Sequence, residues 1–158
     1  MKSAKYASEF LIKRTENAAD LPFPTRQTNM AAGFDLHSNI SAQLKKGERL
    51  LVPVGIKIAL PFGYEAQVRP RSGLALKHGI TVLNTPGTVD ADYRGELMVL
   101  LINLGQENFQ INRGDRIAQM VISKVEMMAF TLLNENEELP ESNRGTAGYG
   151  STGMSQNE

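Results

Sequence analysis

The sequence has 158 residues, a length that suits one domain with a substantial hydrophobic core. Its 17 basic and 17 acidic residues cancel, which argues against attraction of nucleic acid by a general electrostatic field. With no cysteine and two histidines, the sequence excludes disulfides, cysteine nucleophiles, thiolate metal sites and a metal cage built from several histidines.

No apolar run is long enough to predict a membrane span, and the first residues lack the apolar core of a secretory signal. We therefore expect a cytoplasmic protein that binds neither membrane nor nucleic acid. A small local cluster of arginines around an anionic ligand is still compatible with a net charge of zero.

Short segments rich in β-branched and aliphatic residues, separated by glycine and proline turns, predict a protein built from strands. The segment Arg49–Leu60 alternates with a kink at Gly55, so residues of one parity would line one sheet face, namely Val52, Val54, Ile56, Ile58 and Leu60. Further strands are predicted over Glu9–Arg14, from the turn at Gly33 to Leu36, and over Tyr64–Val68, Ile80–Leu83, Leu97–Ile102, Arg116–Val125 and Met127–Leu133. Many short strands of this kind favour an all-β sandwich or barrel.

The stretch from Pro70 to Gly79 predicts one or two turns of helix. Ser72 is a good N-cap, the residues after Gly73 favour helix, and Gly79 can end it. A helix start offers N–H groups to an anion, and Arg71 would add a planar fork of donors suited to phosphate. The same residues also fit an ordinary cap beside a surface arginine.

The stretch from Asn84 to Glu96 contains turn formers between two aliphatic runs, so we expect a wide hairpin joining two strands. Its tip would carry Asp90, Asp92 and Tyr93. Functional groups on a loop held by a rigid sheet are common at binding sites. The two carboxylates could instead serve only to satisfy backbone groups of the turn.

Three other features lead to expectations of their own. Arg116 and Gln119 are three residues apart on a predicted strand and should point to opposite faces, so they need not share one task. We expect His37 and His78 to be structural or exposed rather than catalytic. The apolar run Leu97–Ile102 indicates deep burial or a contact between subunits.

From Asn134 onward the composition becomes acidic and polar, and a glycine-rich stretch follows. Such a segment cannot cover a core, so we predict a β domain over residues 1–133 and a flexible arm over residues 134–158. Arg144 is either a solvated charge at a mobile end or an arginine that the arm brings onto phosphates. In the second case Tyr149 would offer a flat face for stacking on a base.

Taken in order, these signals resemble five motifs of the trimeric dUTP diphosphatase (dUTPase) family. The stretches that carry the resemblance are Ala32–Leu36, Pro70–Ala75, Gly87–Glu96, Arg113–Met120 and Arg144–Gly153. Five ordered motifs are far more specific than any one of them, and they extend over nearly the whole chain. Two residues depart from the family pattern, because Ala147 stands where glycine is usual and Tyr149 where phenylalanine is usual.

The resemblance implies a jelly-roll-like β-barrel or sandwich with one short helix, assembled as a homotrimer whose sites combine motifs of neighbouring subunits. It implies hydrolysis of dUTP to dUMP and pyrophosphate, which lowers dUTP and supplies dUMP for thymidylate synthesis. Mg²⁺ would be held by substrate phosphates and water, with no direct protein ligand. Asp90 matches the carboxylate that orients and deprotonates the attacking water, and Asp35 matches a residue that supports the water shell of the metal.

The resemblance also implies the substrate contacts. Residues that match the nucleoside pocket are Asn84, Gly87, Thr88, Val89, Tyr93 and Met98; those that match phosphate contacts are Arg71, Ser72, Gly73 and Gln119; those that match the closing arm are Arg144, Tyr149, Gly150, Ser151 and Thr152. Asn84 and the strand edge after it would read the hydrogen-bonding edge of uracil. Tyr93 would pack beneath the deoxyribose and leave no room for a 2′-hydroxyl.

Two other functions fit parts of this pattern. A dCTP deaminase shares the fold and most phosphate contacts, but Ser72–Ala75 and Asp90–Gly95 follow the diphosphatase pattern. A nucleotide-sensing interaction protein could retain the fold and use arm closure as a switch. The presence of Asp90, Tyr93 and Arg144 argues against sensing as the only role.

Overall fold

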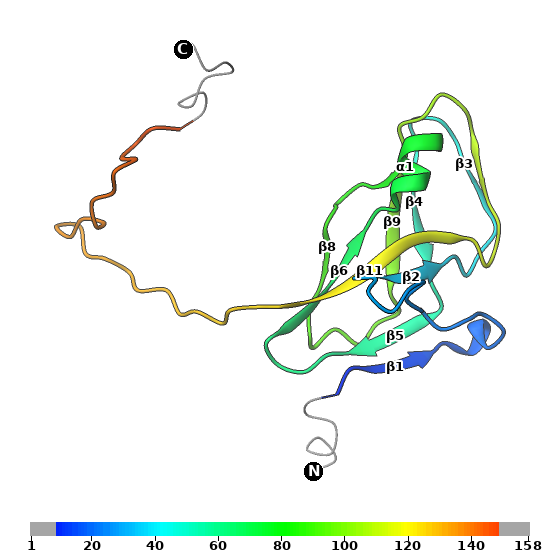
Figure 1. The fold of residues 1–158 in the computed structure, drawn as a ribbon, viewed down its shortest axis with the longest axis horizontal. Coiled ribbons are helices and arrows are strands. Elements are labelled where there is room, and N and C mark those ends of the chain that lie inside the picture. Colours follow the sequence, from blue (N-terminus) through cyan, green and yellow to red (C-terminus); the bar gives the residue numbers. More distant parts are fainter. Residues whose placement is uncertain (1–8, 149–158) are drawn as a thin grey trace. The chain divides into compact units, whose positions relative to one another are not determined.

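The computed structural model describes residues 9–148, and the chain divides into two units, Met1–Met127 and Met128–Glu158. All strands and helices of the described residues lie in the first unit (Figure 1). The strands are β1 (Leu11–Arg14), β2 (Phe34–His37), β3 (Ala42–Leu44), β4 (Arg49–Pro53), β5 (Ile56–Ala59), β6 (Tyr64–Arg69), β7 (Ile80–Val82), β8 (Gly87–Val89), β9 (Met98–Asn103), β10 (Phe109–Ile111) and β11 (Arg116–Lys124). The helices are the 3₁₀ turn η2 (Glu16–Ala18) and the α-helix α1 (Ser72–His78).

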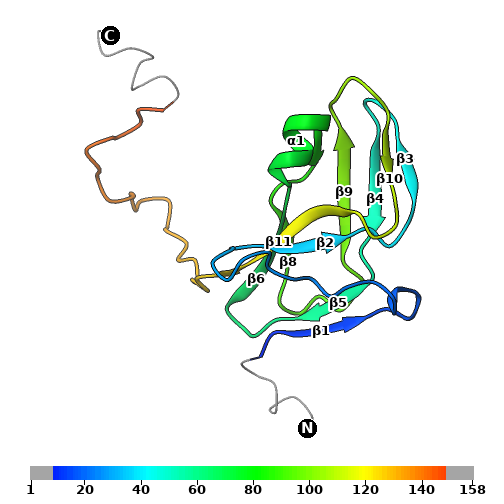
Figure 2. The same cartoon turned by 45° about the vertical axis from the view of Figure 1, so that its right-hand side comes forward.

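Within residues 9–148 the strands form four sheets, and all of their pairings are antiparallel. One sheet has the order β2-β11-β6-β8 and another the order β4-β9-β7, while β1 pairs with β5 and β3 with β10. None of these sheets closes on itself. Helix α1 and strand β1 lie at opposite ends of the unit in both views (Figure 1 and Figure 2). The expectation of an all-β protein with one short helix is confirmed.

The core is built from aliphatic side chains that alternate along the strands, as a period of two residues requires. The face predicted along β4 and β5 is confirmed, because no side chain of that set is more than 7% exposed: Val52, Val54, Ile56, Ile58 and Leu60. Side chains of the four-stranded sheet join the same core, among them Leu36, Val68 and Met120. Gly55 lies at the break between β4 and β5 with φ of 72°, which confirms the predicted kink.

Helix α1 ends as predicted but does not begin as predicted. Gly79 follows it with a left-handed backbone, and its N–H donates to the carbonyl of Ala75. The N-cap is Arg71, and no side chain caps the first turn. The prediction that Ser72 caps the helix is wrong, because Ser72 is already the first helical residue, whereas a capping residue lies outside the helix. No helix among residues 9–148 has the length and apolar character needed to cross a membrane.

Strands β7 and β9 form the arms of the predicted hairpin and pair antiparallel. The chain between them is more than a turn, because β8 leaves this sheet and pairs with β6, with Gly87 opposite Val68. The loop after β8 then reaches β5 of the β1-β5 sheet, where the N–H of Leu97 donates to the carbonyl of Ile56 at 2.8 Å. The hairpin tip is therefore supported by two different sheets.

Strand β11 contains a β-bulge where it pairs with β2. Arg116 lies opposite His37 and Gln119 lies opposite Asp35, so β11 uses one more residue than β2 over the same length. Because His37 and Asp35 share one face of β2, the bulge puts Arg116 and Gln119 on one face as well. The prediction that they point to opposite faces is wrong, since it counted residues along a regular strand.

The strand predicted over Met127–Leu133 is absent, and the segment is irregular. Its apolar side chains face solvent, with Phe130 98% and Leu132 92% exposed. A strand needs a backbone partner, and no strand of residues 9–148 pairs with this segment. The boundary between the two units falls after Met127, ahead of the predicted boundary after residue 133.

Candidate functional site

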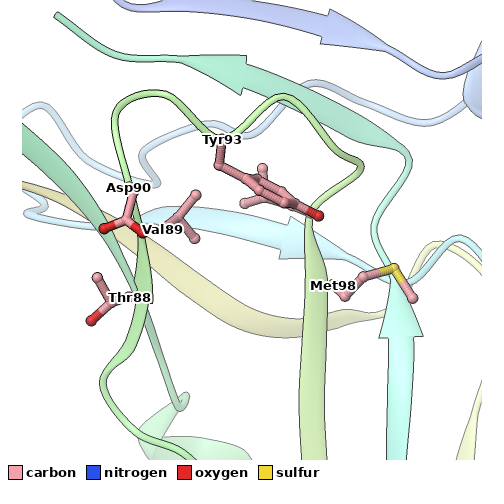
Figure 3. Close-up of a pocket in the computed structure, with 6 residues that line it drawn as sticks. Thr88, Val89, Asp90, Tyr93 and Met98 are labelled. Carbon is pink, nitrogen blue, oxygen red and sulfur yellow. The ribbon is translucent and has the colours of Figure 1, made fainter.

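A cavity of about 180 Å³ lies beside the loop between β8 and β9. We call it the tip cavity, and its lining residues are Thr88, Val89, Asp90, Tyr93, Leu97 and Met98. Strand β8, the loop and the start of β9 each contribute to it, so the structure brings together five of the predicted residues. In the view of Figure 3 the ring of Tyr93 lies between Asp90 and Met98.

The ring of Tyr93 is oriented by its own loop. Its hydroxyl donates to the backbone carbonyl of Glu96 at 3.0 Å. The ring lies so close to Gly95 that a Cβ at that position would collide with the hydroxyl end of the ring. Glycine at this position therefore allows the ring to lie against the backbone, while 45% of Tyr93 stays exposed to solvent.

Backbone and neighbouring side chains hold the loop that carries Asp90. The N–H of Tyr93 donates to the carbonyl of Asp90 at 3.1 Å, and Arg94 donates to the carbonyl of Ala91 at 2.7 Å. The carboxylate of Glu96 accepts a hydrogen bond from the N–H of Gly55 at 2.9 Å, which ties the loop to the corner between β4 and β5. Asp90 is exposed and lines the tip cavity.

Asn84 and Gly87 lie at the entrance to β8, next to the tip cavity but not in its lining. A Cβ on Gly87 would be 3.2 Å from the amide nitrogen of Asn84, so the two residues are in contact. Thr88 and Val89 follow Gly87 in β8, and both line the tip cavity.

A second group of predicted residues surrounds the carboxylate of Asp35, which is only 8% exposed. The Nε atom of Arg71 lies 3.4 Å from Oδ1 of Asp35, and Nη1 of Arg116 lies 3.4 Å from Oδ2. Arg71 also donates to the carbonyl of Arg116 at 2.9 Å. A carboxylate away from water needs such partners, because an unpaired buried charge is strongly destabilising.

Gln119 lies on the same face of β11 and completes what we call the Asp35 cluster: Asp35, Arg71, Arg116 and Gln119. Its amide nitrogen donates to the carbonyl of Pro70 at 3.0 Å. Its amide oxygen occupies the place where a Cβ on Gly33 would lie. Gly33 therefore allows the segment before β2 to approach the side chain of Gln119 closely.

The Asp35 cluster lies beside the first turn of α1, where Ser72 and Gly73 are exposed. A cavity of about 260 Å³ adjoins the cluster and is lined by Arg71, Leu74, Phe109, Asp115, Arg116 and Ile117. It shares no lining residue with the tip cavity. Within one chain, the predicted residues thus form two separate groups.

Neither histidine lines the tip cavity. His37 is half-buried, and this burial lowers the pKa of its side chain, while the neighbouring carboxylate of Asp35 acts in the opposite direction. The ring of His78 packs on the ring of Phe109 with 5.0 Å between centroids. Both positions agree with the expectation that the histidines are structural or exposed.

The residues predicted for the arm belong to the second unit. The Nε of Arg144 donates to the carbonyl of Ala147 at 2.8 Å, within the arm itself. The other four predicted arm residues lie outside the described residues: Tyr149, Gly150, Ser151 and Thr152.

The family model described as dUTPase matches residues 19–153. The chain belongs to the dUTPase family. A deoxyuridine 5'-triphosphate nucleotidohydrolase of Caulobacter vibrioides is 55% identical over 147 residues, which cover 90% of this chain and 93% of the relative. The resemblance read from five motifs is confirmed, and this dUTPase is a hydrolase, a dUTP diphosphatase that converts dUTP to dUMP and pyrophosphate.

Solved structures of phage dUTPases share the fold. The dUTPase of Staphylococcus bacteriophage 80alpha with dUPNHPP has a TM-score of 0.82 at 23% identity, covering 92% of this chain and 98% of that one. A mutant dUTPase of phage phi11 of S. aureus, described with a structural Mg(II) ion, has a TM-score of 0.72 at 23% identity, covering 83% and 100%. The predicted jelly-roll-like all-β fold is thereby confirmed.

Two residues of this dUTPase lie at the predicted groups but were missed as site residues. Leu97 lines the tip cavity although it is only 1% exposed, and its place between the third motif and the predicted residue Met98 was the available signal. Arg116 pairs with Asp35. Its place in the fourth motif was visible, but the bulge that turns it toward Asp35 has no sequence signal that we recognise.

The close approach of Gly33 to Gln119 leads to a prediction about dUTP turnover. In Gly33→Ala the new methyl group should displace the flexible end of Gln119 from the carbonyl of Pro70. We expect an unchanged fold and a KM for dUTP raised about 3–10-fold, the usual worth of one hydrogen bond. Steady-state kinetics and thermal unfolding measure the two effects.

The matched control for this prediction is Gln119→Ala, alone and combined with Gly33→Ala. If both changes act through one contact, the double variant should be no worse than Gln119→Ala. Additive losses in kcat/KM would show that Gly33 acts in another way.

Proposed function

We propose that this dUTPase uses Asp90 to orient and deprotonate a water molecule that attacks the α-phosphorus of dUTP in line. The observation that carries the proposal is the exposed carboxylate of Asp90 on the wall of the tip cavity, beside Thr88 and Tyr93. Backbone groups already close the turn, so this side chain can act on a ligand. The reaction would lower dUTP and supply dUMP for thymidylate synthesis in the cytoplasm.

Replacing Asp90 by asparagine should leave the nucleotide bound but remove the base. We expect turnover of Asp90→Asn to fall by about 10²–10⁴-fold, the usual contribution of a general base, with a small change in KM. Asp92→Asn is the control, because Asp92 is in the same loop but does not line the tip cavity. Near-normal kcat in Asp90→Asn, or a larger loss of kcat in Asp92→Asn, would show that a residue other than Asp90 is the general base.

We assign the nucleoside to the tip cavity. The ring of Tyr93, held by its hydroxyl bond to Glu96 and by its contact with Gly95, offers a fixed face on which a deoxyribose can pack. A fixed ring leaves little freedom to make room for an additional 2′-hydroxyl. Asn84 and the edge of β8 lie close enough to the cavity to pair with the uracil edge, and Met98 lies at the cavity's other side.

Removing the ring should weaken the choice of sugar. In Tyr93→Ala we expect the ratio of kcat/KM for dUTP to that for UTP to fall by about tenfold or more, because a clash in the pocket is relieved. Tyr93→Phe keeps the ring and loses only the hydroxyl bond to Glu96, so it should retain most of the discrimination. A ratio that is the same in wild type and Tyr93→Ala would remove Tyr93 from this role.

We assign the triphosphate to the Asp35 cluster and the first turn of α1. Two guanidiniums there share one carboxylate, which leaves an excess of positive charge beside Gln119. Arg71 is the best-placed side chain for a phosphate, because its planar fork can contact Asp35 and a ligand oxygen together. Ser72 and Gly73 expose backbone and a hydroxyl at the same place.

Mg²⁺ fits this arrangement as an ion held mainly by substrate oxygens and water. Among residues 9–148 there is no group of three or more His, Asp or Glu side chains that could enclose a metal. The Asp35 carboxylate is already paired on both oxygens, so it suits a supporting contact to a metal-bound water better than direct binding. When bound, Mg²⁺ would offset the charge that accumulates on the phosphates.

We further propose that the site is completed in a homotrimer. The outer face of the β4-β9-β7 sheet carries Arg49 at one end and is otherwise largely apolar, with Leu51 52% and Met98 37% exposed and Leu100 paired opposite Leu51. Such a face favours contact with another protein surface. The tip cavity and the Asp35 cluster share no cavity within one chain, which favours a site that joins groups of neighbouring subunits.

Light scattering of the purified protein at micromolar concentration should give about three times the chain mass. Leu51→Glu should lower that mass and the activity together, because a charge would be buried at the contact. Leu104→Glu is the control, since Leu104 is 64% exposed in the loop after β9 and lies outside the sheet face. A fully active monomer would exclude the shared site.

We also propose that the arm closes over bound nucleotide and brings Arg144 onto its phosphates. The described part of the arm, residues 134–148, is exposed, and among residues 9–148 the side chain of Arg144 donates only to the carbonyl of Ala147. Ordering such a segment costs about 1–2 kcal/mol per residue in backbone entropy. Contacts of Arg144 with phosphate, and of Tyr149 with the base, would offset this cost.

Truncation after Asn143 should therefore leave thermal unfolding unchanged while most of the activity is lost, because closure excludes water and adds positive charge. Truncation after Gly153 keeps all predicted arm residues and is the control. Full activity in the shorter protein would show that the arm is not a lid.

A further inference from the structure

The side chain of Arg113, in the turn between β10 and β11, joins three separate chain segments. Its guanidinium contacts both carboxylate oxygens of Asp20, just after the 3₁₀ turn η2. It also donates to the carbonyl of Asn17 at 2.9 Å, to the carbonyl of Asn39 at 3.2 Å and to the side-chain oxygen of Asn39 at 3.1 Å. One side chain thereby connects the loop before β2, the link after β2 and the turn before β11.

The geometry of these contacts separates Arg113 from an ordinary surface ion pair. An exposed pair held by charge alone contributes little, because water and salt screen it. Here a planar fork satisfies acceptors in several directions, and Asn39 is only 5% exposed. The bond from Arg113 lowers the pKa of Asp20 to about 2, so the partner stays ionised at any pH at which the enzyme would work.

The backbone around Arg113 is bonded to the end of β2. The N–H of Ser38 donates to the carbonyl of Asp115 at 2.8 Å, and the N–H of Gly114 donates to the carbonyl of Ser38 at 2.8 Å. The N–H of Arg113 itself donates to the hydroxyl of Ser41 at 2.9 Å. The position of this turn therefore fixes how β11 starts alongside β2.

The bulge in β11 comes directly after this start. It places Arg116 opposite His37 and Gln119 opposite Asp35, so that both face the Asp35 side. A bulged strand has an alternative, which is to slip by one residue into a regular ladder. That slip would turn one of the two side chains to the other face and break the Asp35 cluster.

We propose that Arg113 is a positioning residue for the triphosphate end of the site. By holding the turn against the η2 loop and Asn39, it keeps β11 in the bulged register that presents Arg116 and Gln119 beside Asp35. Arg113 acts through these residues and does not touch the nucleotide. The inference rests on the proposed assignment of the triphosphate to the Asp35 cluster.

The experiment compares Arg113→Ala and Arg113→Lys with wild type. Three readouts are measured in the assembled protein: kcat and KM for dUTP, the Kd of a non-hydrolysable dUTP analogue, and the inhibition constant of dUMP. The product dUMP lacks the β- and γ-phosphates, so it reports mainly on the nucleoside end. Lys45→Ala is the matched control, because Lys45 makes an exposed ion pair with Glu48 in which the charged atoms are 3.7 Å apart. Lys45 lines neither the tip cavity nor the cavity beside the Asp35 cluster.

In Arg113→Ala we expect kcat/KM for dUTP to fall about 10–100-fold, the size of effect that misplaced binding groups produce. The analogue should bind more weakly, while the inhibition constant of dUMP changes less than about twofold. Arg113→Lys should recover little, because a lysine cannot reproduce the fork. Lys45→Ala should behave as wild type in all three readouts.

Unchanged kcat/KM for dUTP in Arg113→Ala would overturn the proposal, and so would equal losses for dUMP and the analogue, which would indicate a general loss of structure. If Arg113→Ala does not fold, Asp20→Asn replaces it and should weaken analogue binding about 2–5-fold without affecting dUMP. No effect in Asp20→Asn would then overturn the proposal.

Arg71→Ala separates this inference from the proposed function. If Arg71→Ala weakens analogue binding and Arg113→Ala does not, only the role of Arg113 is wrong. If Arg71→Ala leaves analogue binding unchanged, the triphosphate is not at the Asp35 cluster, and the assignment beneath the inference is wrong.

Discussion

The buried carboxylate of Asp35 constrains much of the first unit. Water cannot solvate it well at 8% exposure, so it must be paired by protein groups. Its two guanidinium partners come from different parts of the chain, Arg71 before α1 and Arg116 at the start of β11. Meeting this requirement fixes the helix start and the first residue of β11 against β2. The same contacts thus pair the buried carboxylate and bring two positive charges close together.

The tip cavity is organised by a different principle, since few charges are involved. The loop between β8 and β9 is held at both ends by strands of different sheets and in its middle by its own backbone. Rigid support of this kind allows Asp90 and Tyr93 to stay exposed without losing their orientation. The two groups are built independently, so each can be correctly folded within one chain without the other.

Much of the fold follows from local sequence. The alternation along β4 and β5, the helix end at Gly79 and the out-and-back path of β7 and β9 depend on periodicity and turn chemistry, which are visible in the residues themselves. The tip cavity was predictable because its lining is nearly contiguous in sequence, and the family resemblance assigned five of its residues.

What could not be predicted depends on partners distant in sequence. Strand β8 forms because it can pair with the edge of β6, and the residues Gly87–Val89 alone do not indicate that this edge is available. The bulge that turns Arg116 toward Asp35 is a property of pairing with β2. The segment Met127–Leu133 has the composition of a strand, but a strand also needs a pairing neighbour, and composition cannot supply one.

The bulge in β11 has a consequence for how this chain can vary in length. Most turns of the unit lie between strands whose ladders end beside them, so a gained or lost residue there changes a loop and little else. At Ile117 the extra residue lies within the bulge, between Arg116 and Ala118. Deletion of Ile117 would give a regular ladder in which Arg116 and Gln119, then two positions apart, still share one face. The cost would be a core side chain, because Ile117 is only 2% exposed. The extra residue is thus held by the core, so a change of length should be tolerated less well here than at the turn Pro61–Gly63, where Phe62 is 80% exposed.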